Sequence, residues 1–138
     1  MGDPGSAPIR TCVVIADRQS GLFDRIKGLL ETTFSKLFVV SDKSSLIDGA
    51  GRLQPTVIVM DLSFAAGSLT KLVRELRDHA PAAKLLLVSV HDESTVVSAA
   101  IAAGVDGLIL KRELADDLLP AVDALLAGQR YFHSCATR

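Results

Sequence analysis

Four consecutive apolar residues that end on a carboxylate, Val57-Ile58-Val59-Met60-Asp61, constrain this chain more than any other stretch. An unbroken apolar run of this length is typical of a strand buried on both faces, as in a parallel sheet covered by helices. Sheets of that kind bind ligands at the carboxyl ends of their strands. Asp61 is therefore predicted to lie at a ligand site or, more simply, to cap the turn that follows it.

The rest of the chain alternates between short apolar runs and segments in which apolar residues recur every three or four positions. The runs predict four further strands, at 12–16, 37–40, 85–88 and 105–110. The periodic segments predict amphipathic helices at about 20–33, 42–52, 69–80, 92–104 and 113–127. Ser41 or Asp42 is the expected N-cap of the second helix and Asp92 that of the fourth, and Pro120 is expected in a first turn or at a slight kink.

This alternation predicts the fold class. Strands separated by crossover helices form a parallel sheet with right-handed connections, and five such units are too few for an eight-stranded barrel. We therefore predict an α/β fold, (βα)5, with a doubly wound five-stranded parallel sheet in the order 2-1-3-4-5.

Length and composition suit one domain with an aliphatic core, since only 4% of the 138 residues are aromatic. We expect a flexible leader at 1–8, the domain at 9–127, and a tail or the start of an interdomain linker at 128–138. A net charge of -1 gives no reason to expect direct binding of nucleic acid or an anionic membrane. Cys12 and Cys135 do not suggest a disulfide framework, which fits a reducing cytoplasm, and neither a secretory signal nor a transmembrane run is visible.

Four of the predicted strands end in a polar residue: Asp17, Asp61, Ser89 and Lys111. In the predicted order these four strands are contiguous, so their carboxyl ends converge on one shallow pocket. Asp17 and Asp61 could share a hard divalent cation, and Asp61 could attack a phosphoryl group as a carboxylate nucleophile. Lys111 would offset the added charge, and Ser89 would hydrogen-bond a phosphoryl oxygen. Taken singly, each residue is equally explained as a turn cap or a lysine that reaches solvent.

With these residues in place, residues 9–127 resemble the receiver domain of two-component response regulators. In that family an acid ends strand 1, the phosphoacceptor aspartate ends strand 3, Ser or Thr ends strand 4 and Lys ends strand 5. Residues 103–111, Ala-Gly-Val-Asp-Gly-Leu-Ile-Leu-Lys, look like the family's AGADGYLLK segment. Residues 89–93 and 127–131 are similar to the branch with a C-terminal LuxR-type helix-turn-helix domain.

The resemblance implies that a sensor histidine kinase passes a phosphoryl group to Asp61, with Mg²⁺ held by Asp17, Asp61 and the backbone carbonyl of Ser63. Ser89 and Lys111 would move towards the phosphate and repack the face made by helix 4, strand 5 and helix 5. The implied output is transcriptional, through a domain absent from this chain, and the chain is not itself an enzyme. Implied partners are the kinase, a second copy through the helix 4–strand 5–helix 5 face or through helices 1 and 5, and DNA only through the output domain, with no membrane.

Three departures from the family pattern bear on this expectation. Arg18 replaces the second acid after strand 1, the usual direct metal ligand. Either its guanidinium competes with Mg²⁺, so that binding is weakened or absent, or it points to solvent. The segment 63–67 lacks the usual proline. Leu108 stands at the aromatic switch position, and Arg112 replaces the proline often found after the lysine. An alternative is therefore a pseudo-receiver that acts by phosphorylation-independent protein contacts.

Two other classes share parts of the pattern. Phosphatases of the haloacid dehalogenase type also use a strand-end Asp, but their nucleophile is followed two positions on by an acid, and here that position is Ser63. A flavodoxin-like FMN binder needs a hydroxyl-rich phosphate loop after strand 1, and residues 17–21 are a poor match. His91 is expected to be a loop residue and not a base.

Overall fold

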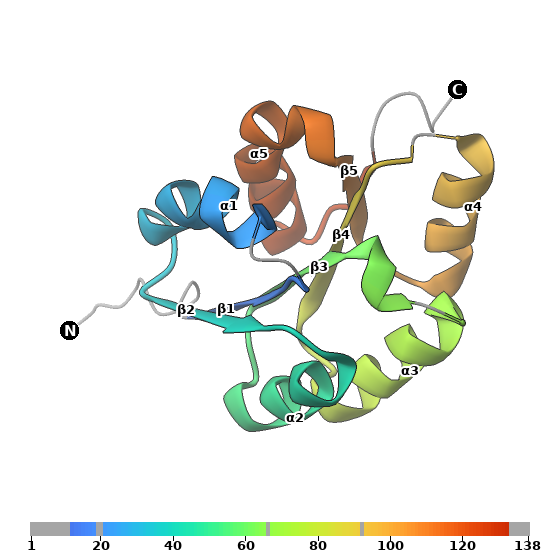
Figure 1. Cartoon of the computed structure of the whole chain (residues 1–138), viewed down its shortest axis with the longest axis horizontal. Coiled ribbons are helices and arrows are strands. Elements are labelled where there is room, and N and C mark those ends of the chain that lie inside the picture. Colours follow the sequence, from blue (N-terminus) through green and yellow to red (C-terminus); the bar gives the residue numbers. More distant parts are fainter. Residues whose placement is uncertain (1–11, 19–20, 66, 92, 133–138) are drawn as a thin grey trace.

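The computed structural model describes residues 12–18, 21–65, 67–91 and 93–132, without the side chains of Leu22 and Phe23. Strands and helices alternate along these residues (Figure 1). The strands are β1 (Cys12–Ala16), β2 (Lys36–Val40), β3 (Val57–Asp61), β4 (Lys84–Ser89), β5 (Gly107–Leu110) and β6 (Tyr131–Phe132). The α-helices are α1 (Gly21–Glu31), α2 (Lys43–Leu53), α3 (Leu69–His79), α4 (Ser94–Ala103) and α5 (Leu114–Leu126), and two short 3-10 helices cover Leu62–Ala65 and Lys111–Glu113.

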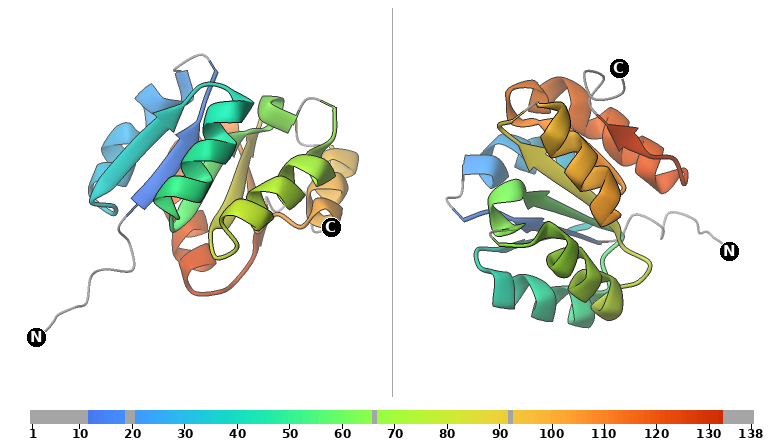
Figure 2. Two further views of the ribbon diagram at one scale, coloured as in Figure 1. Left: turned by 90° about the horizontal axis from the view of Figure 1, so that it is seen from below. Right: turned by 90° about the vertical axis from the view of Figure 1, so that its right-hand side faces the viewer.

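The strands form one parallel sheet in the order β2-β1-β3-β4-β5-β6, which confirms the predicted order and adds a sixth strand. Helices α1 and α5 cover one face, and α2, α3 and α4 cover the other (Figures 1 and 2). No helix in the described part of the chain is long and apolar enough to cross a membrane.

The central strand shows how the core is divided. Val57 and Val59 belong to the buried cluster on the α1/α5 side, whereas Ile58 and Met60 belong to the cluster on the α2/α3/α4 side. All four are fully buried. This two-sided burial is what the unbroken apolar run predicts, because successive side chains of a strand point to opposite faces.

The helix ends follow local chemistry in most places. Asp42 caps α2 as predicted, since its Oδ1 accepts a hydrogen bond from the Ser45 amide at 2.7 Å. Gly104, at φ 93°, ends α4 in the left-handed conformation that glycine adopts without strain. The expected cap at Asp92 lies outside the described residues. Pro120 lies inside α5, past the first turn, so the first-turn alternative was wrong.

Strand β6 is the element that the sequence did not predict. Tyr131 and Phe132 pair in parallel with Gly107 and Leu108 of β5. The approach is so close that a Cβ added to Gly107 would lie 2.6 Å from the Tyr131 carbonyl oxygen. The phenol of Tyr131 donates to Asp117 Oδ1 of α5 at 3.2 Å. Two residues of the predicted tail therefore belong to the sheet, while the boundary of the domain stays a prediction.

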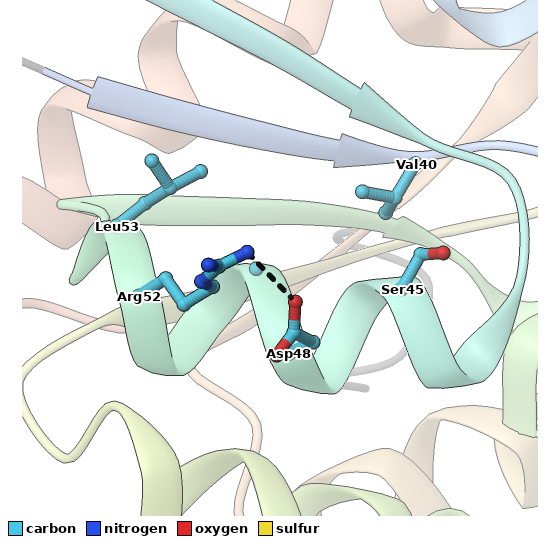
Figure 3. A pocket seen from close by; sticks show the side chains of 6 residues that line it. Val40, Ser45, Asp48, Arg52 and Leu53 are labelled. Atoms are coloured by element: carbon cyan, nitrogen blue, oxygen red, sulfur yellow. Dashed lines mark ion pairs between the residues drawn. The ribbon is translucent and has the colours of Figure 1, made fainter.

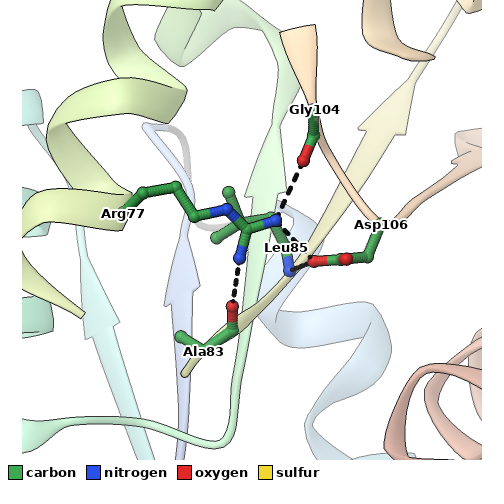
Figure 4. Close-up of polar contacts among 5 residues, drawn as sticks. All are labelled: Arg77, Ala83, Leu85, Gly104 and Asp106. Atoms are coloured by element: carbon green, nitrogen blue, oxygen red, sulfur yellow. Dashed lines mark hydrogen bonds and ion pairs between the residues drawn. The ribbon is translucent and has the colours of Figure 1, made fainter. Parts of the chain in front are cut away.

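A partly exposed network of hydrogen bonds ties the amino ends of β4 and β5 to α3 (Figure 4). The Arg77 guanidinium donates to the carbonyls of Ala83 at 2.7 Å and Gly104 at 2.9 Å, and to Asp106 Oδ2 at 2.9 Å. The same Asp106 oxygen accepts the Leu85 amide at 2.8 Å. One carboxylate thus satisfies a backbone donor and a guanidinium, which holds α3 against the two strands.

We predict that Asp106→Ala lowers the free energy of unfolding by about 2 kcal/mol, because the Leu85 amide and the Arg77 guanidinium lose their acceptor. Urea unfolding followed by circular dichroism measures this. Asp48→Ala is the matched control, since it removes only an exposed pair with Arg52 on α2, which should contribute less than about 0.5 kcal/mol. Equal losses in the two variants would contradict the role of the network.

Candidate functional site

The register of the sheet brings the predicted site residues to one edge. Ala16 pairs with Met60, so Asp17 and Asp61 follow at the same level of neighbouring strands. Asp61 pairs with Val88, and Ser89 pairs with Leu110, the residue before Lys111. The four side chains therefore start from the carboxyl edge of β1, β3, β4 and β5, as the sequence predicts. A cavity of about 220 Å³ opens there and is lined by Asp61, Leu62, Ser63, Ser89, Val90 and His91.

Asp61 is held from two directions. The Lys111 ammonium donates to its Oδ2 at 3.1 Å, and the Ser63 amide donates to its Oδ1 at 2.9 Å. Both side chains of the ion pair are partly shielded, with 19% of Asp61 and 31% of Lys111 exposed. The lysine and the acid, 50 positions apart in sequence, thus form one charge pair at the carboxyl edge of the sheet, and Asp61 is the member that lines the cavity.

The environment of Asp61 sets its ionisation. Burial would raise the pKa of this carboxyl, but the hydrogen bonds from Ser63 and the contact with Lys111 together outweigh burial and hold the pKa below its usual value. A folded-state pKa below that of the unfolded chain means that ionised Asp61 favours folding at neutral pH. That contribution is lost as the pH falls through the folded-state pKa.

Asp17 is the second acid of the site, and its side chain is buried with 4% exposed. Its amide donates to the Val40 carbonyl at 3.0 Å, which fixes the strand end from which the side chain starts. Two carboxylates are hard oxygen ligands of the type that Mg²⁺ prefers, and Mg²⁺ usually keeps several waters. Among the described residues no three His, Cys, Asp or Glu side chains gather to hold a metal. The donor set therefore fits a Mg²⁺ that takes its other ligands from backbone and water.

Ser89 is buried and its hydroxyl is already engaged. It accepts the His91 amide at 2.9 Å and donates to the His91 carbonyl at 3.0 Å. The hydroxyl is thus at the cavity but turned to its own loop. His91 is exposed, and its Nδ1 lies 3.6 Å from Glu93 Oε1, in line with the expected loop residue.

The Arg18 side chain lies over the ring of Phe64, a contact that a metal ligand would not make. Its guanidinium carbon lies 4.8 Å from the centre of the Phe64 ring, and the side chain is exposed. The pKa of Asp42 is lowered mainly by the hydrogen bond from the Ser45 amide, and the charge of Arg18 adds to this lowering. Phe64 itself is buried in the 3-10 helix Leu62–Ala65, so it forms a fixed platform for the cation.

Two contacts of the site were not visible in the sequence. Arg25 of α1 donates to the Lys111 carbonyl at 3.1 Å, which ties the first helix to the end of β5. The Ser63 amide, described above, contacts Asp61 because the chain turns into a 3-10 helix at Leu62. The first contact joins residues 86 positions apart and depends on how α1 packs, so no local pattern could have revealed it.

Comparisons with known proteins agree with this geometry. The family described as response regulator receiver domain matches residues 13–123. The chain is 32% identical over 131 residues to the nitrate/nitrite response regulator protein NarP of Escherichia coli, which covers 94% of this chain and 60% of NarP. It is 28% identical over 127 residues to the transcriptional regulatory protein DegU of Brevibacillus brevis, with 91% and 54% covered. The chain thus spans a little over half the length of these relatives.

Among solved structures, the isolated REC domain of RcsB from Salmonella enterica serovar Typhimurium in the apo form superposes with a TM-score of 0.82. The identity is 24%, and 93% of this chain and 96% of that chain are covered. A response regulator of the LuxR family from Aurantimonas gives a TM-score of 0.81 at 22% identity, with 91% of each chain covered. At these identities the likeness concerns the fold.

We predict that Lys111→Met raises the pKa of Asp61, because the hydrogen bond and the positive charge are lost while burial remains. Carboxyl-detected NMR titration of Asp61 measures the shift. Lys71→Met, on the exposed side of α3, is the control and should leave that pKa where it is. An unchanged pKa in Lys111→Met would show that the contact does not act on the ionisation of Asp61.

Proposed function

This chain belongs to the response regulator receiver domain family, and we propose that it accepts a phosphoryl group on Asp61 from a sensor histidine kinase in the cytoplasm. Its relatives DegU and RcsB are transcriptional regulatory proteins, and receiver domains of such regulators are not enzymes. In the proposed step a carboxylate oxygen of Asp61 attacks the phosphorus of a phosphohistidine. An O–P bond forms, the P–N bond breaks, and its electron pair leaves with the imidazole.

The contact between Lys111 and Asp61 at 3.1 Å is the observation that carries this proposal. Together with the hydrogen bonds from Ser63, which have the larger effect, it offsets burial and lowers the pKa of the Asp61 carboxyl beside an open cavity, and a nucleophile must be ionised. The ammonium also stands where negative charge would accumulate once a phosphoryl group arrives. A turn-capping role alone would need only the Ser63 amide and would not require a lysine from the end of β5.

The proposed metal site consists of Asp17, Asp61 and the backbone carbonyl of Ser63. When bound there, Mg²⁺ would neutralise charge on the phosphoryl oxygens. The residues of the chain have their own tasks: Asp17 supplies a second buried carboxylate, and the Ser63 amide orients one oxygen of Asp61. The exposed Arg18 guanidinium stacks on Phe64, which supports a metal site that the guanidinium leaves open.

The proposed switch begins at Ser89. Its hydroxyl now donates to the His91 carbonyl and would exchange this acceptor for a phosphoryl oxygen. Such an exchange frees the loop that leads into α4. Because Leu108 is fully buried and has no hydroxylated ring, the signal would travel through this loop and through packing on the α4–β5–α5 face to an output domain outside this chain. DNA would be bound by that domain.

A phosphorylation-independent pseudo-receiver remains the second candidate, favoured by one observation. Among the residues that the structure describes, Asp17 and Asp61 are the carboxylates at the site, and Arg18 occupies the sequence position of a third. In that case the fold would present a fixed surface to a partner, and Asp61 would serve only as a hydrogen-bond acceptor for Lys111 and the Ser63 amide.

We predict that the chain incubated with acetyl phosphate and Mg²⁺ gains one phosphoryl group on Asp61, as intact-mass spectrometry would show. Asp61→Asn should stay unmodified, because an amide is too weak a nucleophile. Thr70→Ala, an exposed change on α3, is the control and should react like the unaltered chain. No adduct on Asp61 with either acetyl phosphate or beryllofluoride would sink the phosphoacceptor proposal and leave the pseudo-receiver.

We predict that Arg18→Asp tightens Mg²⁺ binding on the order of tenfold or more, since a carboxylate replaces a cation next to Asp17. Isothermal titration calorimetry measures the change. Arg52→Asp, an equal change of charge on the exposed side of α2, controls for net charge and should have little effect. If both variants bind Mg²⁺ like the unaltered chain, Arg18 does not govern the metal site.

A further inference from the structure

Strand β2 forms one edge of the sheet. It pairs with β1 on its inner side, and no strand among the described residues pairs with its outer side. The opposite edge is closed by β6, which is only two residues long. Proteins usually protect a long open edge with charges, prolines or a bulge, and β2 carries a single charge, at Lys36.

The register identifies the backbone groups that face outwards. The Asp17 amide donates to the Val40 carbonyl, so Val40 directs its backbone groups towards β1. Alternate residues of a strand point their N–H and C=O groups to the same side. Phe38 therefore also faces β1, whereas Leu37 and Val39 present both backbone groups to the open side.

The side chains around this edge are unusually apolar. Of the five large hydrophobic residues that are well exposed in the described chain, three lie here: Phe38 at 36%, Val39 at 42% and Leu53 at 36%. Figure 3 shows the concavity between β2 and α2, with Val40 and Leu53 at its two ends and the Asp48–Arg52 ion pair along α2. Its volume is about 390 Å³, enough to take up an apolar side chain.

We propose that this edge pairs with the β2 edge of a second copy of the chain, antiparallel about a two-fold axis that passes beside Phe38. In this register Leu37 lies opposite Val39 of the second copy, and Val39 lies opposite Leu37 of the second copy. Both are outward-facing, so each opposed pair exchanges two N–H to O=C hydrogen bonds. The two Phe38 residues form the non-hydrogen-bonded pair at the centre, beside the concavity.

Charge complementarity supports a second copy as the occupant. Lys36 begins β2, and Asp42 follows its other end; both are exposed. An antiparallel pairing centred on Phe38 places Val40 of the second copy opposite Lys36, and its Asp42, whose carboxylate caps α2, lies two residues past the end of that strand. The opposite charges of Lys36 and Asp42 therefore lie at the same end of the paired strands, and the symmetry provides this attraction twice. A parallel alignment would instead bring like charges together.

Sedimentation velocity of the whole chain tests the proposal. The unaltered chain is expected to show a concentration-dependent dimer, and Val39→Pro should weaken it at least about tenfold, because each copy loses an N–H donor that faces its partner. A proline is tolerated where the N–H points away from the sheet, so pairing with β1 survives. Val39→Thr keeps the N–H and is the matched control. A chain that stays monomeric into the millimolar range would overturn the proposal.

The register is tested by a cysteine at the centre of the interface. A non-hydrogen-bonded antiparallel pair has its Cα atoms about 4.5 Å apart, which suits a disulfide. With Cys135 replaced by serine and Cys12 buried, Phe38→Cys should oxidise to a linked dimer. Ile101→Cys on α4, with a similar exposure of 38%, should not. Linkage through Ile101→Cys alone would place the contact on the α4 face and overturn the β2 register.

Discussion

The burial of β3 on both faces is the constraint on which the rest of this structure depends. Val57 to Met60 have no solvent-facing side, so helices must cover both faces and each strand must connect by a crossover. The same burial ends abruptly at Asp61, the first residue of the strand whose side chain reaches the edge of the sheet. A charged group at that boundary is shielded enough to interact strongly and open enough to meet a ligand.

The balance at Asp61 links this architecture to the chemistry of the site. Burial raises the pKa of the carboxyl, and two partners from other elements more than offset this effect: the Ser63 amide from the 3-10 helix and the Lys111 ammonium from the end of β5. Arg25 of α1 holds the Lys111 backbone in turn. A phosphoryl group added at Asp61 would disturb all of these contacts at once, which gives a local charge change a route into several elements.

The sequence was a good guide to which residues meet and a poor guide to what each one touches. Strand-end positions placed Asp17, Asp61, Ser89 and Lys111 at one edge, because the register of a parallel sheet follows from its strand order. The sequence did not show that the Ser89 hydroxyl bonds to His91, or that Arg18 stacks on Phe64. These contacts depend on loop geometry, where several rotamers are compatible with the same residues.

By itself, then, the sequence determined the alternation of strands and helices, the aliphatic two-faced core and the set of polar strand ends, since each is written in local periodicity. Only the tertiary structure decided the partners across long separations: the Lys111–Asp61 pair, the Arg77–Asp106 network and the short strand β6 beside β5. Tyr131 and Phe132 carry no strand signal of their own, because two residues are too few for a period. They join the sheet because Gly107 leaves room for the Tyr131 carbonyl and because Asp117 accepts its phenol.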